Sequence, residues 1–129
     1  MSIKVHAAHA PLRPAGMEFW GEMGPEGEPN PTIRFVLPDR TVCFPTGEIK
    51  RWEHIRSTPE RLIIFIAQER ITVTGHDLTD IRFAMDRNRL RELRVASSKA
   101  ELRTGPNIYR IEFESLRMSG QSKQTNCVD

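Results

Sequence analysis

The chain has 129 residues, which suffices for one domain with a buried core, and its 19 basic and 17 acidic residues leave a net charge of +2. This mixed charge permits nucleic-acid binding without favouring it, and two cysteines are too few for a disulfide framework. No apolar run approaches the roughly 18 residues that cross a membrane, and the N-terminus lacks the hydrophobic stretch of a secretory signal. We therefore expect a cytoplasmic protein with no membrane segment and with free thiols.

The sequence predicts three regions. Residues 1–16 have little hydrophobic pattern and contain two prolines, so we expect a flexible N-terminal arm. Residues 17–118 carry all the periodic segments and should form a single α+β domain. Residues 119–129 are polar and predict a flexible C-terminal tail.

Short strands are predicted in the first half of the domain. Residues 17–20 suit a short strand, and residues 21–31, dense in Gly, Pro and Glu, suit an exposed loop. Alternating apolar residues predict strands over residues 33–37 and 41–44, joined by a tight turn. Cys43 is expected to be a buried apolar residue of the second strand, because it lacks the CxxC spacing of a reactive thiol.

Residues 48–56 fit two patterns. Ile49, Trp52 and Ile55 recur every three residues, which suits one face of a helix. Ile49 and Ile55 also share one face of a strand, with Trp52 on the other. We favour a bent strand, because residues 57–60 have the composition of a turn into the next element.

The clearest element is a β-hairpin over residues 62–75. Its first strand is apolar on both faces and should therefore lie at the centre of the fold. We expect Ile66 opposite Ile71 and Ile64 opposite Val73. These four side chains give a wholly aliphatic face, which we assign to the core.

The other face of this hairpin is a candidate interface. It carries Ile63 and Phe65, which are expected opposite threonines of the second strand. Such a face needs cover from a packed helix or from another chain, because an exposed apolar strand promotes aggregation.

An amphipathic helix is predicted near residues 77–88. Asp77 is the expected N-cap, and Asn88 is the expected left-handed residue that ends the helix. The apolar stripe that should face the sheet consists of Leu78, Ile81 and Met85. Phe83 lies off this stripe and should face solvent, so we take it as a further candidate interface residue.

Two strands are predicted after the helix. Residues 90–96 alternate, and a last strand should point Tyr109, Ile111 and Phe113 inward. Several antiparallel strands, one helix and two further strands are typical of the α+β class. We expect a mainly antiparallel sheet, either curled with the helix on one face or shaped as a small open barrel.

The strand spacing over residues 32–75 resembles the strand order of the Sm-like barrels. In that family a helix precedes the strands and a Gly- or His-containing motif lies on the fourth strand. Here the predicted helix follows the strands, and residues 71–75 do not carry that motif, so no binding residue is inferred from the resemblance.

The sequence contains no set of residues that we assign to catalysis, to a cofactor or to a metal. His6 and His9 have a spacing found among metal ligands, but no Cys, Asp or Glu lies near them. His76 and Asp77 form a catalytic pair in one interpretation, whereas a helix cap better explains Asp77. Gly75 suits a tight strand-to-helix turn better than a phosphate-binding loop, because it is a single glycine.

One basic cluster stands out near the end of the predicted helix. Its members are Arg82, Arg87, Arg89, Arg91 and Arg94. Asp80, Asp86 and Glu92 dilute its charge, so ion pairs on a solvated helix end compete with a nucleic-acid contact as its explanation.

Taken together, the pattern favours a non-enzymatic interaction or oligomerisation module whose partner is a second copy or another protein. The reason is a surplus of apolar groups for one small sheet. The alternative is a small barrel-like RNA- or DNA-binding protein that uses the arginine cluster. Arginines gathered on an acid-free surface would favour nucleic acid, and arginines paired with the neighbouring acids would favour the interaction module.

Overall fold

The computed structural model describes residues 17–96 and 105–116. One group of strands consists of β1 (Met17–Glu18), β2 (Gly21–Met23), β3 (Thr32–Val36), β4 (Thr41–Pro45) and β8 (Leu90–Arg94). The other group consists of β5 (Ile49–Ile55), β6 (Glu60–Ile66), β7 (Glu69–His76) and β9 (Asn107–Ser115). A 3-10 turn, η1 (Thr46–Glu48), and one helix, α2 (Thr79–Asp86), complete the elements of the described residues.

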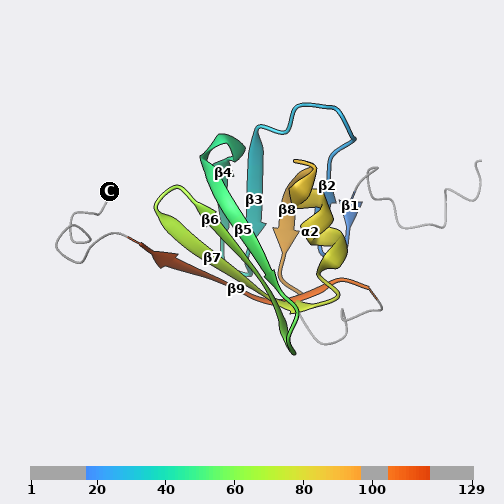
Figure 1. The fold of residues 1–129 in the computed structure, drawn as a ribbon, viewed down its shortest axis with the longest axis vertical. Coiled ribbons are helices and arrows are strands. Elements are labelled where there is room, and N and C mark those ends of the chain that lie inside the picture. The colour runs from blue at the N-terminus through green and yellow to red at the C-terminus, as the bar shows by residue number, and fades with distance from the viewer. Residues whose placement is uncertain (1–16, 97–104, 117–129) are drawn as a thin grey trace, which may run out of the picture.

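The strands form two sheets, which splay apart in Figure 1 with α2 beside β8. The five-stranded sheet has the order β1-β2-β8-β3-β4, and the four-stranded sheet has the order β5-β6-β7-β9. Within the described ranges every pairing is antiparallel except the parallel pair β3–β8. The arm and the tail predicted at residues 1–16 and 119–129 lie outside those ranges.

The predicted α+β class is confirmed, and the two sheets are not closed into a barrel. Helix α2 falls within the range predicted for it, and β8 and β9 follow it. The strand favoured for residues 48–56 is confirmed as β5, whose pairing with β6 shifts between Ile49 and Arg51. The division of the strands between two sheets is a feature that alternation along the chain did not predict.

The central hairpin, β6–β7, is present, but its predicted register is wrong. Its turn occupies residues 67 and 68, the first of which has a φ of 56°. Ile64 faces Ile71 rather than Val73, and Ile66 faces Glu69 rather than Ile71. Side chains alternate with a period of two, so this slip of two residues leaves each of them on its predicted face.

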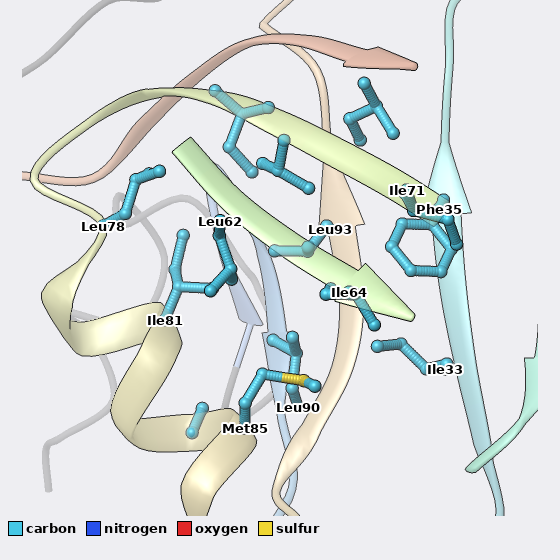
Figure 2. Packing of buried hydrophobic residues seen from close by; sticks show 14 of the residues in the cluster. Ile33, Phe35, Leu62, Ile64, Ile71, Leu78, Ile81, Met85, Leu90 and Leu93 are labelled. Carbon is cyan, nitrogen blue, oxygen red and sulfur yellow. The ribbon is translucent and has the colours of Figure 1, made fainter. Parts of the chain in front are cut away.

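The core fills the space between the two sheets and α2 (Figure 2). Leu62 and Ile64 of β6 and Phe35 of β3 are fully buried there. Figure 2 shows the predicted helical stripe pointing into the same space, and its members are Leu78, Ile81 and Met85. The inner face of the four-stranded sheet is therefore covered by α2 and the other sheet.

Helix α2 begins later than predicted. Leu78, not Asp77, is its N-cap and provides no side-chain cap, and Asp77 has a φ of 56°. Asn88 has a φ of 54° just beyond the helix, as expected for a left-handed stop.

The inward orientation predicted for Tyr109 is wrong because β9 contains a bulge. Thr74 pairs with Arg110 and Gly75 pairs with Ile108, so Tyr109 is the extra residue between them. A bulge interrupts the alternation of side chains. Tyr109 is consequently exposed, and Ile108 takes the buried position.

Two further expectations differ from the structure. Residues 21–23, predicted to be loop, form β2 and pair with β8, a contact between segments far apart in sequence. Cys43 is exposed, because Phe44 takes the inward position on β4 and neighbouring side chains point to opposite faces.

We expect Ile64→Ala to lower the free energy of unfolding by about 2–5 kcal/mol, because the change removes buried methyl groups and leaves a cavity. Ile63→Ala is the matched control, since Ile63 is only partly buried and lies on the opposite face of β6. Urea denaturation followed by circular dichroism measures both values. Equal losses for the two variants would contradict the assignment of the faces.

Candidate functional site

A cavity of about 440 Å³ lies between α2 and the β1–β2 hairpin. We call it the α2 groove. Its lining residues are Glu18, Trp20, Met23, Asp80, Phe83, Ala84, Arg87, Arg89 and Pro106.

Helix α2 contributes one continuous stripe to this groove. Asp80, Phe83, Ala84 and Arg87 follow the i, i+3, i+4, i+7 spacing that places residues on one helix face. The core stripe contains Ile81 and Met85 and borders the groove stripe at Ala84, which is buried in the core and also lines the groove. The short helix therefore presents adjoining faces to its own core and to the groove, with Ala84 at the boundary.

Phe83 is the exposed aromatic side chain of the groove stripe. Its exposed fraction is 41 %, which agrees with the solvent-facing position predicted from the sequence. The guanidinium groups of Arg82 and Arg87 lie 4.9 and 5.5 Å from the centre of its ring. These cation–π contacts hold the ring at the helix surface, where it remains partly exposed.

Buried apolar side chains form the floor of the groove and charged side chains form its rim, so its accessible lining is mixed rather than apolar. Trp20 and Ala84 are almost fully buried, with exposed fractions of 7 % and 2 %. Arg89 is fixed at the rim, because its Nε donates a hydrogen bond of 2.8 Å to the carbonyl oxygen of Gly24. Carboxylates and guanidinium groups both line this rim, so its charge is mixed.

The five arginines of the predicted cluster divide into two groups. Arg87 and Arg89 line the groove. The other three are engaged with acidic residues, and the N–O distances are 2.8 Å for Arg82–Asp86, 2.7 Å for Arg94–Glu92 and 3.9 Å for Arg91–Glu22. The structure therefore pairs three of the five arginines with acids and leaves Arg87 and Arg89 at the groove.

Ile63 and Phe65 lie on the outer face of the four-stranded sheet, away from the α2 groove. Both are partly buried. The guanidinium of Arg51 lies 4.0 Å from the centre of the Phe65 ring, and Ile63 pairs with Glu53 and Thr72 of the flanking strands. The structure therefore separates these two candidate interface residues from Phe83, and their role remains a prediction.

The sequence did not single out Glu60, which links β5, β6 and α2. Its Oε1 lies 2.8 Å from Nε2 of His54. Its carboxylate accepts hydrogen bonds from the backbone N–H groups of Asp77, at 3.0 Å, and Leu78, at 3.1 Å. Burial raises the pKa of Glu60, but the hydrogen bonds from His54, Leu78 and Asp77 outweigh it and lower the pKa below its ordinary value of 4.5.

His54 is buried beside this carboxylate. Its side chain is 4 % exposed, and its Nδ1 has no hydrogen-bond partner in the described part of the chain. Because the ionised carboxylate of Glu60 only accepts hydrogen bonds, the proton of a neutral His54 lies on Nε2. The only signal for this pair in the sequence was the position of Glu60 at the start of the central strand.

The two residues considered as a catalytic pair, His76 and Asp77, contact other groups in the structure. His76 contacts the hydroxyl of Tyr109 and lies 3.1 Å from Nδ2 of Asn107, whereas the backbone N–H of Asp77 binds Glu60.

Gly75 allows a close approach of strands, because a Cβ there would lie 2.0 Å from the carbonyl oxygen of Asn107.

Within residues 17–96 and 105–116, no group of three or more His, Cys, Asp or Glu side chains is arranged to hold a metal ion. His6 and His9 lie outside these ranges.

No protein-family model, curated protein or solved structure matches the chain. In the part of the chain that the structure describes, no helix is long and apolar enough to cross a membrane.

We expect Glu60→Gln to lower the free energy of unfolding by about 1–3 kcal/mol at neutral pH, because the start of α2 loses a charged hydrogen-bond acceptor. The pKa of Glu60 is lowered in the folded state, so its stabilisation is present above pH 4.5 and is lost as the pH falls through the folded pKa. Denaturation at pH 7, 5 and 3 measures this dependence.

The matched control is Glu53→Gln, because Glu53 is an exposed residue that pairs with Arg51 on the outer sheet face. The wild type should approach Glu60→Gln in stability at the lowest pH. A constant difference between these two proteins at all three pH values would contradict the assignment.

Proposed function

We propose that this protein is a non-enzymatic interaction module that assembles with a protein surface through the α2 groove. The observation that carries the proposal is Phe83, an aromatic side chain left exposed at the edge of a cavity with a mixed apolar and charged lining. Lone exposed apolar residues are common on protein surfaces. Phe83 differs from them because it lies beside the buried walls formed by Trp20 and Ala84.

The make-up of the groove supports this function. Protein interfaces typically have an apolar centre, a polar rim and an enrichment in aromatic residues, Met and Arg. The α2 groove combines Trp20, Met23 and Phe83 with a rim that includes Arg87 and Arg89. Energetically dominant contacts are usually aromatic or arginine side chains in well-packed pockets, and Phe83 is the side chain of this kind that a partner would cover.

The arrangement of the arginines supports a protein partner over nucleic acid. Binding to nucleic acid depends on basic side chains that are free to neutralise phosphate groups and so release the counterions of the nucleic acid. Arg82 and Arg94 are instead engaged by Asp86 and Glu92, and Glu18 and Asp80 add negative charge to the groove. An RNA- or DNA-binding role is the alternative that the experiment below separates.

We expect the wild-type protein to be a dimer or larger assembly at micromolar concentration, as measured by light scattering coupled to size-exclusion chromatography. Phe83→Ser should shift it toward monomer, because losing a central aromatic contact costs about 2 kcal/mol, roughly thirtyfold in affinity. Leu116→Ser is the matched control, since Leu116 is 46 % exposed and does not line the groove. Circular dichroism checks that each variant is folded.

Two outcomes would contradict the proposal. One is an unchanged assembly state in Phe83→Ser. The other is a monomeric wild type that binds labelled oligonucleotides with an affinity that falls steeply with salt, which would favour the nucleic-acid alternative.

A further inference from the structure

We propose that the occupant of the α2 groove is the α2 helix of a second copy of this chain, packed antiparallel about a two-fold axis. This inference rests on the proposed function and names its partner. In a two-fold contact both copies use the same surface. If a residue of one copy contacts a second residue of the other copy, the reverse contact is also present across the axis. The groove stripe of α2 meets this condition in both charge and size.

The charges of the stripe are complementary to themselves. Asp80 lies at the start of α2 and Arg87 directly follows its end, about 10 Å apart along the axis at 1.5 Å per residue. An antiparallel copy centred between Phe83 and Ala84 places Asp80 opposite the partner's Arg87, and Arg87 opposite the partner's Asp80. The dimer then contains two ion pairs, whereas a parallel copy in the same register places like charges together.

The sizes of the central residues are also complementary. In this register Phe83 lies opposite the partner's Ala84, so the largest side chain of the stripe meets the smallest. Ala84 forms part of the cavity wall together with Trp20 and Met23, and this cavity of about 440 Å³ has room for a phenyl ring. Because the two-fold axis repeats this contact, the Phe83 ring of each copy lies in the groove of the other.

The other charges of α2 are already neutralised within the chain. Nη1 of Arg82 lies 2.8 Å from Oδ2 of Asp86, and Oδ1 of Asp86 accepts a hydrogen bond of 2.8 Å from the indole of Trp52. Among the described residues Asp80 and Arg87 form no ion pair, and the guanidinium of Arg87 contacts the carbonyl oxygen and the ring of Phe83. The helix dipole favours an acidic residue at the start of α2 and a basic residue at its end. It does not explain why both residues lie on the groove stripe.

Two single charge reversals test this arrangement. Asp80→Arg gives a stripe with two positive ends, and Arg87→Asp gives a stripe with two negative ends. Each variant alone should dimerise at least tenfold more weakly than the wild type, because like charges meet twice across the axis. Mixed together, they should form a heterodimer within about threefold of the wild-type affinity, because both opposite-charge pairs return.

Analytical ultracentrifugation measures each protein and the equimolar mixture, and native mass spectrometry separates heterodimer from homodimers. The matched control is a mixture of Glu53→Arg and Arg51→Asp, which carries the same charge changes on the outer sheet face. These control variants should each dimerise as the wild type does. Circular dichroism establishes that all four variants are folded.

A measurement independent of charge uses cysteine pairs in a Cys43→Ser, Cys127→Ser background. Oxidation of an Asp80→Cys and Arg87→Cys mixture should give a covalent heterodimer, and each variant alone should give far less covalent dimer. Homodimers of both reversal variants at wild-type affinity, or efficient crosslinking of each cysteine variant alone, would overturn the antiparallel arrangement. If the antiparallel arrangement fails but Phe83→Ser still weakens assembly, the groove is an interface for a different surface. If Phe83→Ser also leaves assembly unchanged, the proposed function fails as well.

Discussion

The burial of the inner face of β6 and β7 is the constraint on which the rest of the structure depends. Leu62, Ile64 and Ile71 are fully buried, and the second sheet covers them together with α2. Burial of each such side chain contributes roughly 2 kcal/mol, so α2 must present Ile81 and Met85 to the sheet. Once that face of the helix is fixed, Phe83 can only point away from the core, into the α2 groove.

Much of this arrangement could be predicted from local sequence. The apolar run at the centre of the chain predicted β6, the helical spacing predicted both the buried stripe of α2 and the exposure of Phe83, and Asn88 predicted the end of the helix. Each of these features depends on residues a few positions apart. The prediction of which hairpin residues share a face was correct for the same reason, although the predicted register was wrong by two residues.

The features that were missed depend on contacts between distant parts of the chain. Nothing near residues 21–23 indicates that they pair with β8, and nothing near Tyr109 indicates that Gly75 shifts the register of β9. The role of Glu60 also depends on a distant contact. Its carboxylate accepts the backbone hydrogen bond that an N-cap side chain would normally accept, although it lies 17 residues before Asp77. The second wall of the α2 groove belongs to the β1–β2 hairpin. Patterns within the helix sequence therefore could not predict the cavity.

The anchoring of α2 connects the stability of the fold to the groove. Glu60 holds the start of the helix against β6, and Arg89 binds Gly24 just after its end. A helix fixed at both ends presents its groove stripe in one orientation, so little conformational entropy is lost when a partner binds. Protonation of Glu60 removes one of these anchors, because a neutral carboxyl group is a weaker acceptor for the N–H groups of Asp77 and Leu78. Acidic conditions that weaken the fold should therefore also loosen the helix face to which we assign the proposed assembly.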